Sequence, residues 1–384
     1  AVTAFTLAGR ALLPGRRFAE ATLRIDGAII TRVEPGLDPA ADVRVDGWIV
    51  PGFIDLQLNG AYGRDFSTDG AGVAAVAERL PAAGTTAFLA TLITSPFDCY
   101  PQRLAEIAAA APTAASAAVL GVHLEGPYFN PARKGAHNPA LLRPIDCAEV
   151  SAWASHPLVR LVTLAPELPG GLETVRALRA RGLVVSAGHS DATYAEAQAA
   201  FAAGVGCGTH LFNAMRPLFH REPGLAGALL EAPIPCGLIA DGLHVHPAAL
   251  TLAYRAKGPD QLALITDAIS AMGALPGRIQ LGGQTVIVDA VSARLPDGTL
   301  AGSLLTLDQA VRNMITFTGC SLAEAVQMAS ETPARILGLE RKGRLAAGCE
   351  ADLVVLDDAL QVTHTWTRGT LAFAAGAPTL REGA

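Results

Sequence analysis

Short apolar runs alternate with longer segments of helical period through the middle of the chain, residues 48–345. The apolar runs predict eight strands, at 53–57, 86–92, 119–125, 159–165, 183–189, 208–212, 237–242 and 262–267. Helix starts are indicated by S/T-x-x-E patterns at 193–196 and 321–324. This alternation predicts an α/β protein with a (β/α)8 TIM-like barrel. A doubly wound sheet shares the alternation, but no G-x-G-x-x-G follows the first strand.

The two ends of the chain have a different pattern, typical of β-strands. Residues 22–36 alternate apolar and polar positions around Asp26-Gly27, a hairpin signal, and residues 348–376 contain apolar runs that end in Asp-Asp and Arg-Gly. We therefore expect residues 1–47 and 346–384 to form one small β-sandwich domain beside a barrel at 48–345. A turn-rich stretch with β-like alternation, 275–300, interrupts the pattern after the eighth strand.

Composition narrows the class of protein. Of the 384 residues, 51% are hydrophobic and 17% are charged, which excludes a disordered chain. The 29 basic and 35 acidic residues give a net charge of −6 with no basic run, so neither nucleic acid nor a membrane is expected as a partner. The six cysteines lack a C-x-x-C arrangement, residues 1–17 lack a secretory pattern, and the charge-free stretch 107–122 is broken by Pro112. We expect a cytoplasmic protein.

Polar residues stand at the ends of most predicted strands, although buried parallel strands are normally apolar throughout. In a barrel these strand ends converge on one face, where barrel active sites lie. The residues concerned are Gln57, Asn59, Glu125, His189, His210, Asp241, His244 and Asp267.

One carboxylate and two imidazoles, from Glu125, His189 and His210, match a catalytic zinc site with an open position. For each residue taken alone, a buried polar group that is hydrogen-bonded within the protein is a more common interpretation than a metal ligand. Burying several such groups without a partner costs several kcal/mol, so the set of three favours a metal. His123 shares the face of the strand with Glu125, which we prefer because it lies nearer the strand end. Asp267 either exchanges a proton with the water that the metal activates or serves as a structural helix cap or ion-pair partner.

Two loops add candidate binding groups. In the loop within 123–139, His137 either polarises a carbonyl group or stabilises the loop. In the loop within 209–227, Asn213 can donate a hydrogen bond to a substrate, and Arg221 lies near a helix start, a position that suits a phosphate or carboxylate. A surface ion pair is the alternative role for Arg221, and Arg216 is the competing anion binder.

Several segments together resemble the amidohydrolase superfamily and, more narrowly, its N-acetylglucosamine-6-phosphate deacetylase family. They lie at 51–60, 123–139, 188–204, 209–227, 239–247, 265–268 and 300–303. HLEGP with KGAHNP, and HLFNAM with REPG, are the most specific. The resemblance implies metal-dependent hydrolysis of the acetamide of N-acetylglucosamine 6-phosphate to glucosamine 6-phosphate and acetate, in amino-sugar catabolism or recycling. It also implies a homodimer.

Roles for individual residues also follow from the resemblance. It implies that Glu125, His189 and His210 bind the metal and that Asp267 and His137 are catalytic. Substrate-binding positions are implied at Ala136, His137, Asn213, Ala214, Arg221, His244, Leu300, Ala301 and Gly302.

One departure from the superfamily concerns the metal count. Most amidohydrolases have H-x-H at the end of the first strand, which holds a second metal, and this chain has Gln57 and Asn59 there. Amides are poor zinc ligands compared with imidazole, so we expect one divalent metal per chain, Zn²⁺ in first place, with Fe²⁺, Mn²⁺ or Co²⁺ as alternatives. The rival functions are another amidohydrolase reaction, such as a cyclic amidase or base deaminase, and a barrel that has lost catalysis. The loop motifs weigh against the first and the intact candidate ligands against the second.

Overall fold

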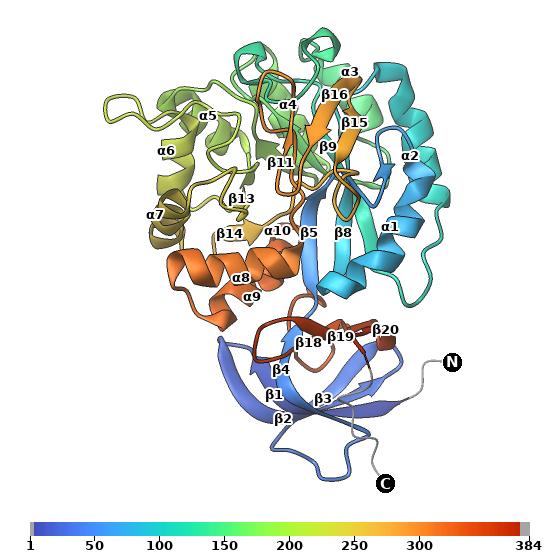
Figure 1. The fold of residues 1–384 in the computed structure, drawn as a ribbon. Helices are drawn as coiled ribbons and strands as arrows, with labels where there is room; N and C mark the ends of the chain where they lie inside the picture. The colour runs from blue at the N-terminus through green and yellow to red at the C-terminus, as the bar shows by residue number, and fades with distance from the viewer. Residues whose placement is uncertain (1–3, 377–384) are drawn as a thin grey trace.

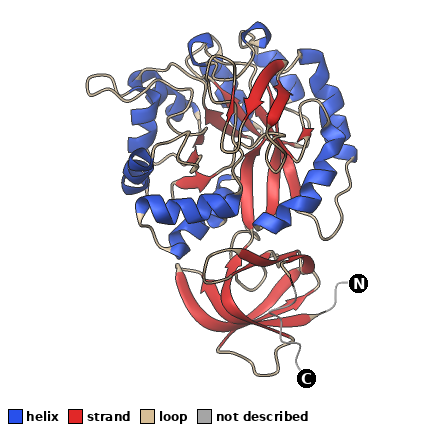
Figure 2. Cartoon of the chain, viewed as in Figure 1, coloured by secondary structure: helices blue, strands red, loops and turns tan. Residues whose placement is uncertain are grey.

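Eight parallel strands form a barrel with helices around its outside in the computed structural model, which describes residues 4–376 (Figure 1, Figure 2). Each predicted strand is present, although several are shorter than the apolar runs suggested. In sheet order they are β14 (Leu262–Leu264), β13 (Cys236–Leu238), β12 (Cys207–Gly208), β11 (Val184–Ala187), β10 (Val159–Leu164), β9 (Ala118–Glu125), β8 (Thr85–Ile93) and β5 (Phe53–Leu58). The predicted barrel fold is confirmed.

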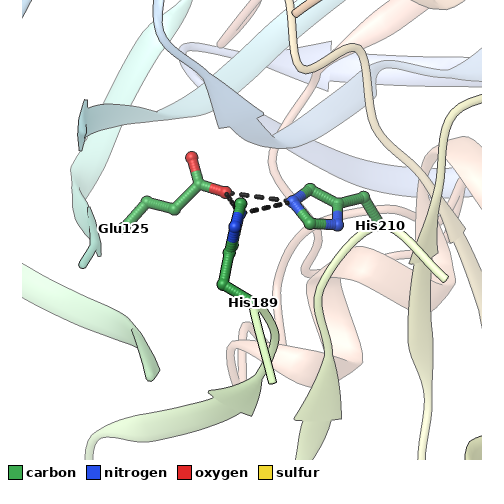
Figure 3. Close-up of side chains that lie close together, drawn as sticks. All are labelled: Glu125, His189 and His210. Carbon is green, nitrogen blue, oxygen red and sulfur yellow. Dashed lines mark hydrogen bonds and ion pairs between the residues drawn. The ribbon is translucent and has the colours of Figure 1, made fainter. Parts of the chain in front are cut away.

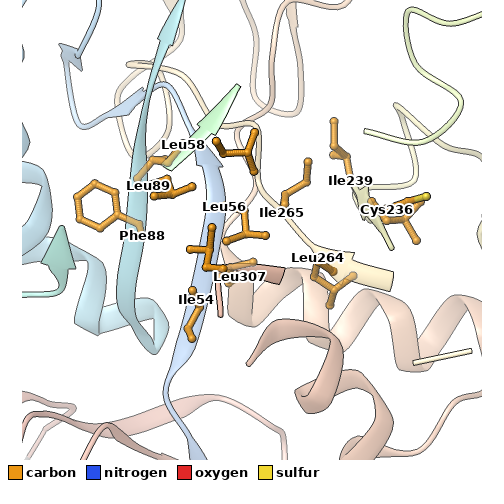
Figure 4. Packing of buried hydrophobic residues seen from close by; sticks show 14 of the residues in the cluster. Ile54, Leu56, Leu58, Phe88, Leu89, Cys236, Ile239, Leu264, Ile265 and Leu307 are labelled. Carbon is orange, nitrogen blue, oxygen red and sulfur yellow. The ribbon is translucent and has the colours of Figure 1, made fainter. Parts of the chain in front are cut away.

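The barrel closes between its first strand and the residues that follow its last. Leu58 of β5 forms a parallel bridge with Ala268, and the Asp267 amide donates to the Gln57 carbonyl oxygen at 2.9 Å. We call this contact between β5 and residues 265–268 the seam. Ile54 and Leu56 of β5 and Leu264 of β14 belong to the main cluster of buried hydrophobic side chains (Figure 4).

Helices connect the strands and cover the barrel (Figure 2). The capping patterns predicted at 193–196 and 321–324 are both present as reciprocal capping boxes, at the starts of α5 and α9. The helices are α1 (Val73–Arg79), α2 (Tyr100–Ala109), α3 (Cys147–Trp153), α4 (Gly171–Ala180), α5 (Tyr194–Ala203), α6 (Gly224–Glu231), α7 (Pro247–Lys257), α8 (Leu307–Thr318), α9 (Leu322–Ala329) and α10 (Glu331–Ile336). Among the helices of residues 4–376, none combines the length and hydropathy that a membrane crossing requires.

Both ends of the chain contribute to a second, β-rich part that lies below the barrel in Figure 1. Its strands follow one another in the order β20 (Thr370–Ala374), β19 (Val362–Thr367), β18 (Leu353–Leu356), β4 (Val43–Pro51), β1 (Phe5–Leu13), β2 (Arg17–Asp26) and β3 (Ile29–Pro35).

This β domain built from both ends confirms the prediction, with one hydrogen-bonded order of seven strands in place of two separate stacked sheets. The sheet curves enough to enclose a core of its own, because Phe5 of β1 stacks on Trp366 of β19 at 6.2 Å between ring centroids. The domain boundaries at 47/48 and 345/346 stay predictions, and residues 1–3 and 377–384 lie outside the described residues.

The turn-rich stretch after the eighth strand forms a small antiparallel sheet. Its strands are β15 (Gly277–Leu281), β16 (Gln284–Val288) and β17 (Ala293–Arg294). Figure 1 shows β15 and β16 beyond the carboxyl ends of the barrel strands, on the side opposite the β domain. A two-stranded ribbon, β6 (Gly60–Ala61) and β7 (Arg64–Asp65), follows β5 at the same end.

Candidate metal centre and substrate cavity

Glu125, His189 and His210 meet at the carboxyl ends of three barrel strands (Figure 3). Glu125 is the last residue of β9, and the two histidines follow the ends of β11 and β12 by two residues. His189 Nε2 lies 3.3 Å from Glu125 Oε1 and 3.1 Å from His210 Nε2, while His210 Nε2 lies 3.2 Å from Glu125 Oε1. All three side chains are buried.

These three atoms have the spacing of ligands around one ion. In a tetrahedral site with bonds of about 2.0–2.1 Å, neighbouring ligand atoms are about 3.3 Å apart. His189 Nδ1 lies 3.0 Å from the Arg133 carbonyl oxygen, which can only accept, so Nδ1 carries the proton and Nε2 presents its lone pair. Burial alone would raise the pKa of Glu125, but its hydrogen bonds with His189 and His210 outweigh this and hold it well below the usual range. The residues therefore fit a divalent metal.

The backbone at this site is strained. His189, His210 and Asp267 have φ of 50°, 31° and 49°, in the left-handed region that costs a non-glycine residue about 1–3 kcal/mol. Backbone hydrogen bonds stabilise the conformation at Asp267, whose amide donates to the Gln57 carbonyl and whose carbonyl accepts from the Ser303 amide at 2.8 Å. These backbone conformations cost stability, and they direct the three side chains toward one site.

Asp267 is held beside the ligand triad by two amides. Asn59 Nδ2 donates to Asp267 Oδ1 at 2.7 Å, and Gln57 Nε2 donates both to that oxygen at 3.2 Å and to Glu125 Oε1 at 2.8 Å. Burial, and then the charge of Glu125, raise the pKa of Asp267 to about 6. Gln57 and Asn59, which stand in the second-metal position, therefore hold Asp267, the candidate proton carrier. Gln57 also links it to the candidate ligand Glu125.

A cavity of about 300 Å³ opens onto the triad and Asp267. Most substrate-binding positions implied by the resemblance line it, namely Ala136, His137, Asn213, Ala214, His244, Leu300 and Gly302. Burial, and then the neighbouring His189, lower the pKa of His137 to about 3, so its ring is neutral at neutral pH. The ring lies 4.6 Å from that of His189, and its Nδ1 is buried without a hydrogen-bond partner among residues 4–376.

Two predicted substrate residues lie away from this cavity within the chain. Arg221 is exposed, on the loop before α6, and its Nη1 lies 2.9 Å from His220 Nε2. Ala301 is buried in the packing behind Leu300 and Gly302, which do line the cavity. A role for Arg221 in substrate binding stays a prediction.

Two weaker candidates are engaged elsewhere. Arg216 donates to Asp191 Oδ2 and to the Asp191 carbonyl oxygen, both at 2.7 Å, so its guanidinium group serves an internal ion pair and not an anion. His123 points below the site, where its Nε2 lies 2.7 Å from Thr163 Oγ1. The structure therefore brings Glu125, and not His123, together with the two histidines.

Sequence reasoning missed several residues of the site. Arg133 acts through its carbonyl group, and Asp191, which follows His189 closely, binds the Arg133 side chain at 2.7 Å. Ile93, Ile269 and Leu281 line the cavity with apolar side chains. A backbone contact leaves no trace in residue type, and aliphatic residues carry no chemical signal. Only the position of Asp191, in the same GHSD segment as His189, could have drawn attention.

Comparisons with known proteins agree with this arrangement. The model of the amidohydrolase family matches residues 48–374. The N-acetylglucosamine-6-phosphate deacetylase of Bos taurus is 45% identical over 341 residues, which are 85% of this chain and 83% of that protein. The enzyme of the same name from Bacillus subtilis is 41% identical over 85% of each chain.

A solved structure of N-acetyl-D-glucosamine-6-phosphate deacetylase from Mycobacterium smegmatis, in complex with N-acetyl-D-glucosamine-6-phosphate, superimposes with a TM-score of 0.90 at 36% identity. The alignment covers 97% of this chain and 100% of that one.

The choice between Glu125 and His123 as ligand can be tested with matched variants. Glu125→Gln removes a ligand charge and should weaken Zn²⁺ binding at least about a hundredfold, since even outer contacts of metal sites are worth 10- to 100-fold. His123→Gln, on the same strand, should bind Zn²⁺ as the wild type does. Equilibrium dialysis followed by elemental analysis measures both. Loss of metal in His123→Gln, with Glu125→Gln unaffected, would reverse the assignment.

Proposed function

The chain belongs to the amidohydrolase family, within the group of N-acetylglucosamine-6-phosphate deacetylases, and on this premise we propose the reaction it catalyses. It is an enzyme that hydrolyses the acetamide of N-acetylglucosamine 6-phosphate to glucosamine 6-phosphate and acetate. The observation that carries the proposal is the position of Asp267, which two amides hold beside the ligand triad at the floor of one cavity.

Asp267 carries the proton that this hydrolysis must move. A divalent metal held by Glu125, His189 and His210 supplies Lewis acidity, which acidifies water and polarises a carbonyl oxygen. Asp267 accepts the proton of the attacking water and delivers it to the departing amine. Neutral His137 lines the same cavity, where its N–H can stabilise the negative charge that develops on the carbonyl oxygen.

The proposed metal content is one ion per chain, Zn²⁺ in first place. Gln57 and Asn59 occupy the position of a second site, but their amide N–H groups donate to Glu125 and Asp267, and amides are poorer zinc ligands than imidazole. A mixed nitrogen and oxygen ligand set with an open position is the set that catalytic zinc prefers.

A homodimer would bring a cationic group to a cavity that neither lysine nor arginine lines among residues 4–376. Arg221 sits at the end of an exposed loop whose neighbours Leu218 and Phe219 are 51% and 61% exposed. Large exposed apolar side chains next to each other are typical of interaction sites. We propose that this loop packs on a second copy of the chain and brings Arg221 to that copy's cavity.

A cytoplasmic location is part of the same proposal. The six cysteines are all free in the structure, as expected where thiols stay reduced.

The role of Asp267 is tested by Asp267→Asn. The amide cannot accept the proton, so kcat should fall by about 10²- to 10⁴-fold, while Zn²⁺ content stays at the wild-type level. Acetate release from N-acetylglucosamine 6-phosphate measures the reaction, and an ammonia assay run in parallel excludes deamination. A variant with near wild-type kcat would remove Asp267 from the mechanism.

The metal count is tested by elemental analysis of the protein after dialysis against metal-free buffer. One tightly bound divalent ion per chain is expected, and a chelator should abolish acetate release. Two tightly bound ions per chain would contradict the hydrogen-bonding role given to Gln57 and Asn59.

The phosphate role is tested by Arg221→Ala. Hydrogen bonds to charged groups are worth about 1.5–3 kcal/mol, so KM for N-acetylglucosamine 6-phosphate should rise about 10- to 100-fold. KM for unphosphorylated N-acetylglucosamine should change little. Arg255→Ala, on exposed surface of α7, is the matched control. An equal effect of Arg221→Ala on both substrates would place the phosphate elsewhere.

A further inference from the structure

The cavity beside the metal triad has two unlike walls. One wall is polar and is formed by Asn213 and His244 from the loops after β12 and β13. The other is apolar and includes Ile93, Ile269 and Leu281. A small-molecule site usually uses such an apolar surface to accept the apolar part of its ligand.

Barrel topology places Ile93 of the apolar wall and Asn213 of the polar wall on opposite sides of the barrel. Ile93 is the last residue of β8, and Asn213 follows β12, which lies four strands away in the closed order of eight. Ile269 follows the reactive Asp267 by two residues, just past the seam. The apolar wall therefore begins directly beside the group that exchanges the proton.

The small sheet after β14 completes this wall and is fixed in place. Leu281 at the end of β15 is 6% exposed and belongs to the same buried cluster as Ile93 and Ile269. The turn after it packs on the end of β8, because a Cβ at Gly282 would lie 3.4 Å from Ile93 Cδ1. Gln284 Nε2 donates to the Ala136 carbonyl oxygen and so ties the sheet to the loop that carries His137.

We infer that the wall of Ile93, Ile269 and Leu281 receives the methyl group of the substrate's N-acyl chain and that Leu281 limits the length of that chain. This inference rests on the proposed function. The scissile carbonyl carbon must lie close to both the triad and Asp267, and its nitrogen and methyl substituents then point away from each other. The hydroxyl-bearing sugar suits the polar wall, and the methyl group is the one purely apolar end of the substrate.

The inference is tested with glucosamine 6-phosphate that carries N-formyl, N-acetyl, N-propionyl or N-butyryl groups. The wild type should have its highest kcat/KM with the acetyl substrate. Leu281→Ala makes room for the longer chains and should raise the butyryl-to-acetyl ratio of kcat/KM by about tenfold or more, since one methylene in an apolar pocket is worth 10- to 200-fold. Leu281→Phe fills the space and should lower the acetyl-to-formyl ratio.

Ile287→Ala is the matched control, because Ile287 lies on β16 of the same small sheet but is 46% exposed and does not line the cavity. It should keep the wild-type ratios. Wild-type protein that releases no acetate from the acetyl substrate would overturn the proposed function itself. Acetyl hydrolysis with unchanged ratios in both Leu281 variants would overturn only the role of this wall, as would an equal shift in Ile287→Ala.

Discussion

The seam between β5 and residues 265–268 is the contact on which the site depends. Buried Asp55 spans it, since its carboxylate accepts from the Thr266 hydroxyl at 2.6 Å, from the Thr266 amide at 3.2 Å and from the Gln57 amide at 3.1 Å. Burial raises the pKa of Asp55 to about 7 even though the Thr266 hydroxyl lowers it, so this carboxyl is costly to bury. The hydrogen bonds of Asp55 fix the register of the seam. This register places Asp267 next to Gln57, whose side-chain amide donates to both Asp267 and Glu125.

Electrostatics explain why this arrangement needs a cation. Glu125 is buried and Asp267 is half-buried, and Glu125 raises the pKa of its neighbour. Their hydrogen-bond partners within the described residues are amides and imidazoles, without a lysine or arginine. A divalent ion on the triad supplies the missing positive charge where two imidazole lone pairs and one carboxylate oxygen already converge. The free energy of metal binding would also offset the backbone strain at His189 and His210, because these two residues are themselves candidate ligands.

Sequence patterns predicted the barrel, the β domain and the meeting of the polar strand-end residues because these depend on residue type and spacing. Glu125, His189, His210 and Asp267 are polar interruptions at the ends of apolar runs, and parallel strands bring such ends together. The strand lengths were less predictable, since apolar residues past β12 and β13 continue as loop that packs inward. Arg221 shows another limit, because a residue type that suits a phosphate does not say which cavity it reaches. Leu281 shows a third, since nothing in an aliphatic residue of a turn-rich segment reveals that it lines a cavity.

The reacting groups and Leu281 lie on parts of the fold that tolerate substitution differently. The reacting groups stand on rigid strand ends around a closed barrel, where a shift of one residue would remove a ligand or break the seam. The small sheet of β15, β16 and β17 is an addition after the last strand, and it reaches the cavity through Leu281 while its hydrogen bonds lie largely within itself. Replacing a side chain there alters the shape of one wall without moving Asp267 or the triad. The reacting groups and Leu281 are thus carried by separate elements, which allows the contribution of Leu281 to acyl preference to vary while the reaction type is kept.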